Sequence, residues 1–174
     1  ILLNGAEKFS AIGNKKSAGT KLVCFDSFFK NPGVYEIEMG TPMKKVLYEI
    51  GGGFKEDVKA LQIGGPLGGV VPIQEVEKLN LDFQEFTTAG FMLGHASIVS
   101  IPKDFPMVEY IHHLFEFTAE ESCGKCFPGR LGSYRGKEMF DQAKKKTAKI
   151  PLKLINELLI TMKKGCLCAL CGAI

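Results

Sequence analysis

The sequence lacks a long apolar run and an excess of charge of either sign. No uninterrupted apolar run approaches about 18 residues, the minimum for a membrane-spanning helix. With 22 Lys and Arg against 19 Asp and Glu, the net charge is only +3, too little for a strongly basic nucleic-acid module. Hydrophobic residues at 45% exclude a disordered or collagen-like chain. We expect a soluble, cytoplasmic protein of one domain or two small ones.

Motifs for hydrolysis and nucleotide binding are also missing. There is no Ser-His-Asp set, no carboxylate pair in a recognisable frame and no zinc-hydrolase motif. The glycine-rich GGPLGG at 64–69 lacks the Lys-Ser or Lys-Thr of a P-loop and the G-x-G-x-x-G spacing, so we interpret it as a tight connection. The chain opens ILLNGAEKF, without an initiator Met or a signal-peptide layout, and we interpret Ile1 as a boundary within a longer polypeptide.

Cysteine is distributed unevenly. Cys24 stands alone, and the other five cysteines fall in the last 52 residues. These five are Cys123, Cys126, Cys166, Cys168 and Cys171. A disulfide-stapled secreted domain usually spreads its cysteines, whereas close C-x-x-C and C-x-C pairs suit sulfur ligands of one metal centre. Metal or cluster ligation is therefore the first hypothesis, and Cys24, on a predicted strand, is expected to be a small buried hydrophobe.

The first hundred residues predict short strands. Segments 19–26 (GTKLVCFD) and 34–39 (VYEIEM) flank the turn-forming Asn31-Pro32-Gly33, which indicates a hairpin. Further strands are expected at 59–63 and within 91–101. Between them, Thr41 is expected to cap a helix with Pro42 at its first position, and apolar residues recur at helical spacing up to Ile50. This order predicts a compact α+β unit of the β-grasp type, with the helix covering one sheet face.

After Pro102 the hydrophobic period becomes helical. Apolar stripes within 107–115 and 152–162 predict two helices, and 139–148 predicts a basic-faced helix between them. The second part is therefore expected to be a small helical bundle that carries the cysteines.

The cysteine loop has features that suit a metal cluster. ESCGKCFPGR places Cys123 and Cys126 near a helix start, where free N–H groups and the helix dipole favour thiolate charge. Lys125 and Arg130 can offset more of that charge, and Gly124 and Gly129 permit close approach of backbone N–H to inorganic sulfide.

Spacing does not distinguish structural zinc from a 4Fe-4S cluster, since both take four cysteines. His112 or His113 could also ligate iron, although only one of two adjacent helical residues can face a cluster, and we interpret both as surface or half-buried residues. Glu121 and Ser122 are expected to cap a helix or to bond the loop.

Seven segments together resemble one known family over nearly the whole chain. They are GAEKFSAIG, GTKLVCFD, NPGVYEIEMGTP, QIGGPLGG, GFMLGHASIV, FTAEESCGKCFPGRLGSYRG and GCLCALCGAI. This string is similar to the C-terminal half of the NADH-binding flavoprotein subunits. That family includes the flavoprotein subunit of complex I and the beta or diaphorase subunits of NAD-dependent formate dehydrogenases and NAD-linked hydrogenases.

The resemblance implies an architecture. Residues 1–10 would be the tail of a flavin domain, 11–104 a ubiquitin-like, SLBB-type β-grasp domain, and 105–174 a helical iron-sulfur domain. FMN and NAD(H) would bind only in the missing N-terminal domain, because the family's GRGGAGFP-like motif is absent here. The implied partners are that flavin domain, in the same polypeptide or a split subunit, and the iron-sulfur subunits of a multi-subunit oxidoreductase.

The resemblance also implies a ligand set. The family's pattern is C-x-x-C-x-x-C plus a distant cysteine, and Cys123, Cys126 and Cys168 match three of these positions. Gly129 occupies the third position and has no donor atom. The substitute is expected to be Cys171, with Cys166 as the next choice, and a 3Fe-4S centre or a water-ligated iron as further alternatives. The expected ligands are thus Cys123, Cys126, Cys168 and Cys171.

Two functional hypotheses follow. In the first, the segment relays electrons between FMN and iron-sulfur centres of partner subunits through a 4Fe-4S cluster, without bond-making chemistry of its own. In the alternative, it is a structural zinc-binding or metal-free module that docks subunits.

Overall fold

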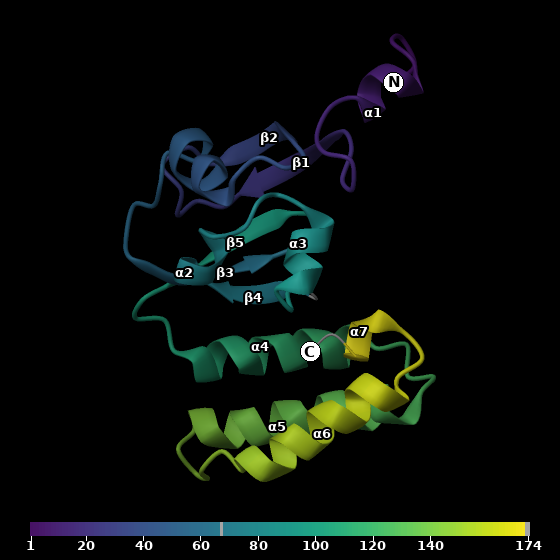
Figure 1. The fold of residues 1–174 in the computed structure, drawn as a ribbon. Helices are drawn as coiled ribbons and strands as arrows, with labels where there is room; N and C mark the ends of the chain where they lie inside the picture. The colour runs from purple at the N-terminus through teal and green to yellow at the C-terminus, as the bar shows by residue number, and fades with distance from the viewer. Residues whose placement is uncertain (67, 173–174) are drawn as a thin grey trace. The chain divides into compact units, whose positions relative to one another are not determined.

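The computed structural model describes residues 1–66 and 68–172, so Leu67 of the GGPLGG loop and the last two residues of the chain, 173–174, lie outside it. The chain divides into two compact units, Ile1–Lys103 and Asp104–Ile174 (Figure 1). Within the described ranges, we find no helix with the length and apolar character needed to cross a membrane.

The first unit is built on a five-stranded mixed sheet with the order β2-β1-β5-β3-β4 (Figure 1). Its strands are β1 (Thr20–Phe25), β2 (Gly33–Glu38), β3 (Val58–Ile63), β4 (Gly69–Pro72) and β5 (Ser97–Pro102). β1 and β2 form the predicted antiparallel hairpin. β5 then returns parallel to β1 and antiparallel to β3, which is the strand order of a β-grasp unit. The predicted α+β class is confirmed.

Short helical segments accompany this sheet: α1 (Ala6–Ser10), the π-helix η1 (Lys45–Ile50), α2 (Ile73–Val76) and α3 (Phe83–Thr88). The prediction that Thr41 caps the helical segment after the hairpin, which is η1, is wrong. The Thr41 hydroxyl instead donates to the backbone carbonyl of Glu38 at 2.8 Å, so it closes the turn after β2.

The core of this unit lies on one face of the sheet. Val23 and Phe25 of β1 are buried together with Met43, two residues before η1, and Leu47 of η1. Cys24 is exposed, and the prediction of a buried hydrophobe is therefore wrong. Side chains alternate along a strand, so with Val23 and Phe25 in the core, Cys24 points to the opposite face.

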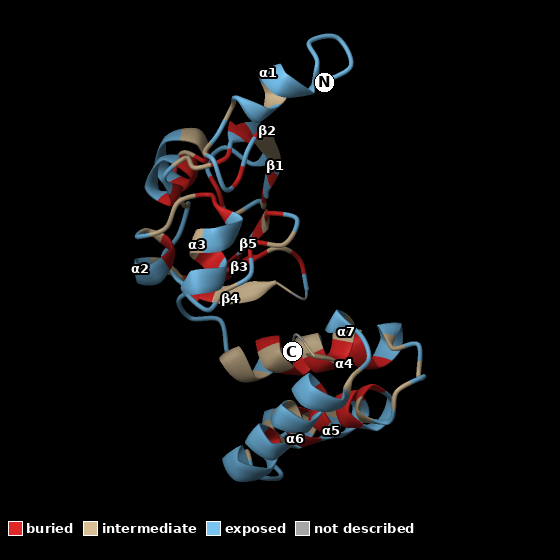
Figure 2. Ribbon diagram, turned by 45° about the vertical axis from the view of Figure 1, so that its right-hand side comes forward, coloured by how far each residue is buried: buried red, intermediate tan, exposed pale blue. Residues whose placement is uncertain are grey.

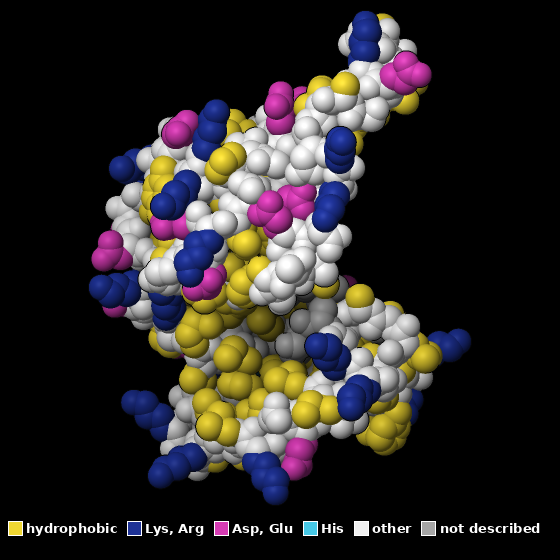
Figure 3. Space-filling view, viewed as in Figure 1, with side chains coloured by type: hydrophobic (Ala, Val, Ile, Leu, Met, Phe, Trp, Pro, Cys, Tyr) yellow, Lys and Arg dark blue, Asp and Glu magenta, His cyan; other side chains and the backbone are white. Residues whose placement is uncertain are grey.

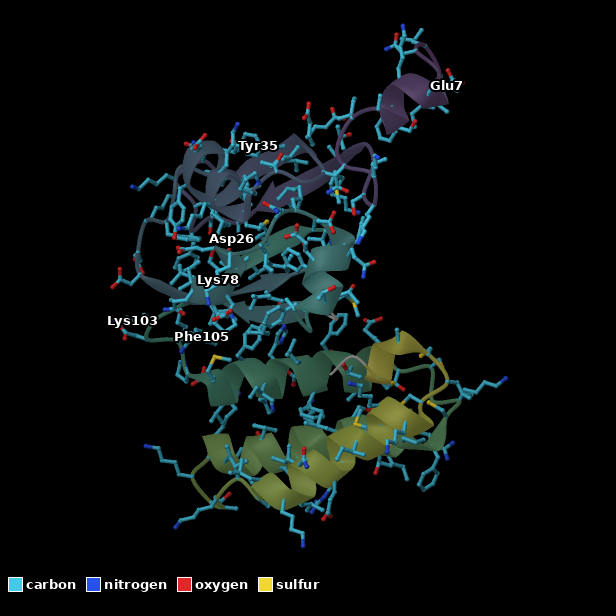
Figure 4. All side chains as sticks on the ribbon, viewed as in Figure 1. Glu7, Asp26, Tyr35, Lys78, Lys103 and Phe105 are labelled. Carbon is cyan, nitrogen blue, oxygen red and sulfur yellow. The ribbon has the colours of Figure 1, made fainter. Side chains whose placement is uncertain are left out.

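Asp26, labelled in Figure 4, lies just after β1 and ties it to β5. Its carboxylate accepts the backbone N–H and the hydroxyl of Ser100, and it also accepts the N–H of Phe28 at 3.0 Å. The polar end of the hairpin is thereby fixed against the central strand.

The second unit is a helical bundle of α4 (Met107–Glu121), the π-helix η2 (Pro128–Gly132), α5 (Ser133–Lys144), α6 (Leu152–Gly165) and α7 (Ala169–Gly172). α4, α5 and α6 lie side by side in Figures 1 and 2, with buried residues on their facing sides. The buried core includes Phe115, Phe140 and Met162. The rings of Phe115 and Phe140 stack with centroids 5.7 Å apart.

The helix predicted at 139–148 runs instead over Ser133–Lys144. Gly136 lies within this helix, at a position where a Cβ would overlap the ring of Phe115. Glycine at this position lets α4 and α5 approach closely, although in sequence it resembles a helix breaker.

Candidate metal centre

Two cysteine-bearing segments about forty residues apart in sequence meet in the helical unit. The first is the loop Ser122–Cys126 between α4 and η2, and the second is residues 166–172 after α6. η2 contacts both α6 and α7, which brings the second segment beside Cys126. The sulfur atoms drawn in Figure 4 include several at this end of the unit.

Local backbone structure fixes the first segment. The N–H of Gly124 donates to the Ser122 hydroxyl oxygen at 3.3 Å, so the predicted role of Ser122 in bonding the loop is confirmed. Gly124 has a φ of 72°, a left-handed conformation that glycine adopts at no steric cost. The carbonyl of Cys126 accepts the N–H of Arg130 at 3.0 Å, which closes the first helical turn. Cys126 therefore stands at a helix start, as predicted.

Three sulfurs form a chain of contacts. The Cys166 thiol is within hydrogen-bonding reach of both Cys126 and Cys171, and the Ser122 hydroxyl donates to the Cys171 sulfur. Among the described residues, no three or more His, Cys, Asp or Glu side chains surround a common point suited to a single metal ion. The three sulfurs are neighbours in pairs, with Cys166 as the middle member.

Gly129 lies directly beside two of these sulfurs. A Cβ at this position would be 2.7 Å from the Cys171 sulfur and 2.9 Å from the Cys126 sulfur, closer than real Cβ atoms approach. The backbone is held in the π-helical turn, where the Gly129 carbonyl accepts the Ser133 hydroxyl at 2.6 Å. The Cys171 sulfur thus occupies the space that a side chain at position 129 would need.

The three thiols differ in acidity for identifiable reasons. Backbone N–H groups of Leu167 and then Gly129 donate to the Cys126 sulfur and lower its pKa, because they stabilise the thiolate. Burial, and then the neighbouring Cys126 and Cys171 sulfurs, raise the pKa of Cys166 to about 12. Burial also raises the pKa of Cys171. Cys126 is the thiol among these three that is most readily converted to the ligating thiolate form.

The other sequence-predicted residues lie apart from this group or at its edge. Cys168 is exposed and close enough to Cys171 for an electrostatic effect. Cys123 is exposed, three residues before Cys126. Lys125 and Arg130 are exposed, and the aliphatic part of Arg130 lies 3.7 Å from where a Cβ of Gly124 would be.

The two histidines take no part in the cysteine group. His112 is buried, with its Nδ1 3.5 Å from the Lys144 amine and its Nε2 3.8 Å from an Asp141 oxygen. His113 is exposed. His112 is more deeply buried than the predicted surface or half-buried position, whereas the exposed His113 agrees with that prediction.

Sequence reasoning did not find the central place of Cys166 or the π-helical turn. Cys166 is the second choice after Cys171 on the sequence alone, and its two sulfur contacts depend on how α6 ends. The sequence feature that could have indicated this place is Cys166 itself, because the resembled family usually has Ser at that position.

The donor set and its surroundings fit an iron-sulfur cluster. Thiolates are the ligands of such clusters, and donor N–H groups directed at a sulfur tune them. The described residues supply a cysteine pair in the first segment, three cysteines in the second, and a side-chain-free position at Gly129 between them.

Comparison with known proteins agrees with this fit. Residues 109–174 match the family described as the NADH-ubiquinone oxidoreductase-F iron-sulfur binding region. This segment belongs to that 4Fe-4S family. The resemblance to the NADH-binding flavoprotein subunits is thereby confirmed.

Curated relatives extend the similarity beyond the 4Fe-4S region. The HndC subunit of the NADP-reducing hydrogenase of Solidesulfovibrio fructosivorans is 34% identical over 98% of this chain and 35% of its own length. The F subunit of the NADH-quinone oxidoreductase of Escherichia coli K12 is 38% identical over 76% of this chain and 30% of its own length. The chain therefore spans about a third of the length of these curated relatives.

Solved structures show the same fold around the 4Fe-4S region. An NAD+-reducing NiFe-hydrogenase in the H2-reduced state superposes with a TM-score of 0.86 and 25% identity, covering 99% of this chain and 29% of that chain. The air-oxidised state of such an enzyme gives the same TM-score with 26% identity.

Proposed function

We propose that this chain is the electron-transfer segment of an NAD(H)-linked flavoprotein subunit. The observation that carries the proposal is the meeting of Cys126, Cys166 and Cys171 beside Gly129 within the 4Fe-4S family segment. A bound 4Fe-4S cluster supplies one-electron storage, and the protein holds it, tunes its potential and shields it from water.

The proposed ligands are Cys123, Cys126, Cys168 and Cys171. Cys126 and Cys171 are favoured by their position on either side of Gly129. Cys123 and Cys168 come from the resemblance and lie at the exposed side of the same segments. Cys166 is the competing ligand, since its sulfur is already in contact with two others.

Hydrogen-bond donors next to the Cys126 and Cys171 sulfurs would tune a bound cluster. The N–H groups of Leu167 and Gly129 donate to the Cys126 sulfur, and the Ser122 hydroxyl donates to the Cys171 sulfur. Such hydrogen bonds stabilise negative charge on sulfur and raise the reduction potential of a cluster. The buried side chains of Phe115 and Met162 belong to the same hydrophobic cluster as Cys171.

The wider assignment follows from the relatives. We propose that FMN and NAD(H) bind in a domain outside these residues and that iron-sulfur centres of partner subunits exchange electrons with this one. The parent complex would be an NAD-linked hydrogenase, a formate dehydrogenase or an NADH dehydrogenase. Hydrogenase and NADH-quinone oxidoreductase subunits are among the relatives named above, which supports two of these three.

Anaerobic reconstitution with iron and sulfide tests the proposal. We expect about four irons and four labile sulfides per chain, a broad brown absorbance and an electron paramagnetic resonance signal after dithionite. Cys126→Ala should abolish the absorbance, whereas Cys24→Ala, an exposed cysteine in the other unit, should leave it unchanged. One zinc per chain without labile sulfide would contradict the proposal and favour a structural docking module.

A further inference from the structure

Two partly exposed cysteines from different segments are neighbours within the cysteine group. The Cys126 and Cys166 thiols lie within hydrogen-bonding reach of each other. Both residues are partly exposed, whereas Cys171, the other sulfur neighbour of Cys166, is only 4% exposed. A small reagent in solution can therefore reach both members of the pair Cys126 and Cys166, while the pair Cys166 and Cys171 has one member covered.

The backbone holds these two cysteines next to each other. The N–H of Leu167, the residue after Cys166, donates to the Cys126 sulfur. Cys166 is fixed at the end of α6, where its N–H donates to the Met162 carbonyl at 3.0 Å. On the other segment, the Cys126 carbonyl accepts the N–H of Arg130 at 3.0 Å. A disulfide requires two cysteines that can join without backbone movement, and these anchored neighbours suit it.

The surface around the pair suits an anionic oxidant. Residues 122–135 and 158–172 contain no Asp or Glu, whereas Lys125, Arg130, Lys163 and Lys164 are exposed there. In Figure 3, basic side chains, drawn in dark blue, lie beside hydrophobic ones over this end of the helical unit. Oxidised glutathione carries carboxylates and a net negative charge at neutral pH, so a basic surface raises its local concentration.

We propose that Cys126 and Cys166 form a reversible disulfide when the chain carries no cluster, and that this disulfide and a bound cluster exclude each other. The sulfur–sulfur bond between Cys126 and Cys166 forms while that of oxidised glutathione breaks. The two protein thiols give up two electrons and two protons, which leave with two molecules of reduced glutathione. The disulfide depends on the contact alone, whereas the mutual exclusion rests on the proposed function, in which Cys126 is a cluster ligand.

Peptide mapping of the full chain tests the bond. The chain is prepared without iron, reduced, freed of reductant under nitrogen and incubated with oxidised glutathione. We expect the loss of two hydrogens, a peptide pair joined through Cys126 and Cys166, and four of the six cysteines left outside it. Cys24→Ser, which changes an exposed cysteine of the other unit, should form the same joined pair, whereas Cys166→Ser should not. A chain that joins Cys166 to Cys171, or forms no joined pair, would overturn the proposal.

Loading with iron tests the exclusion. The unaltered chain is reconstituted with iron and sulfide, freed of excess reagents and given the same oxidised glutathione under nitrogen. We expect no joined pair while the iron stays bound, because a Cys126 sulfur that ligates iron is not free to join Cys166. Removal of the iron by a chelator should then allow the joined pair to form, and a thiol reductant should separate it again.

The two proposals fail in different ways. A reduced chain that assembles no cluster would overturn the proposed function and the exclusion with it, while the peptide map of the iron-free chain still decides the disulfide. A joined pair in a chain that keeps all its iron would overturn the exclusion alone. A joined pair that forms in the iron-free chain, and neither in the loaded chain nor in Cys166→Ser, supports the inference.

Discussion

Replacing Gly129 by alanine tests the close approach on which the cysteine group depends. The new Cβ would lie 2.7 Å from the Cys171 sulfur and 2.9 Å from the Cys126 sulfur, whereas comfortable non-bonded contacts begin near about 3.5 Å. The sulfurs must therefore retreat by about 0.6–0.8 Å. Overpacking of this kind costs about 1–3 kcal/mol, and the better helix propensity of alanine returns about 1 kcal/mol. We expect Gly129→Ala to lower the free energy of unfolding by about 1 kcal/mol and to reduce bound iron.

Urea unfolding followed by circular dichroism, with iron analysis on the same samples, measures both effects. Gly172→Ala is the control, because the nearest atoms that its Cβ would meet among the described residues beyond its own helix belong to Lys163, at 3.8 Å. The control should keep its iron and unfold at the same urea concentration as the unaltered chain or a higher one. If Gly129→Ala behaves like this control, the sulfur of Cys171 does not lie against position 129 and the reasoning is refuted.

Exchanging the residues at positions 129 and 171 tests whether the two positions share one sulfur site. Cys171→Gly removes one sulfur and opens space, and Gly129→Cys adds a sulfur where that space opens. Each single variant should hold less iron than the unaltered chain, whereas the double variant should recover most of it, since interacting positions are not additive. A double variant with no more iron than the poorer single variant would show that the two positions do not share one sulfur site.

Three other changes probe the fold around the site. Gly136→Ala should cost about 2 kcal/mol of unfolding free energy in urea, because its Cβ would overlap the buried Phe115 ring, and an unchanged midpoint would contradict the close packing of α4 and α5. Asp82→Ala should cost about 2 kcal/mol, since the carboxylate caps α3 through the Glu85 N–H at 2.9 Å and accepts from Asn14 at 2.7 Å. Burial, and then the Lys144 charge, lower the pKa of His112, so the unfolded chain binds a proton more readily below about pH 6.5. Stability should then fall from pH 7.5 to pH 5.5, less steeply in His112→Gln than in the exposed control His113→Gln.

Local patterns in the sequence were sufficient to predict four of the five strands of the first unit and the helical segment that ends at Ile50, but not α1, α2 or α3. The hairpin follows from alternating residues on both sides of Asn31-Pro32-Gly33, and the structure places its strands at Thr20–Phe25 and Gly33–Glu38. β4 was missed because Gly69–Pro72 follows a glycine-rich loop and has few residues to alternate. A strand this short depends on its partner β3 rather than on its own composition.

The face that each side chain occupies was harder to predict than the elements. Cys24 lies on a correctly predicted strand, yet its burial depends on which side of the sheet receives the helical segment. A one-residue change of register would reverse it. Likewise, spacing indicated that five cysteines serve one centre, but which sulfurs touch depends on the end of α6 and on the path of residues 166–172.

The π-helical turn Pro128–Gly132 sets how Gly129 lies between the two cysteine segments. π-Helical turns are rare and frequently occur at functional sites. Here it places Gly129 so that its N–H donates to the Cys126 sulfur while its bare Cα faces the Cys171 sulfur. An ordinary side chain at position 129 would separate the two cysteine segments, and a cysteine there would duplicate the sulfur that Cys171 already supplies. In the proposed ligand set, the bare Cα of Gly129 therefore leaves room for the Cys171 sulfur of the other segment to serve as the substitute ligand.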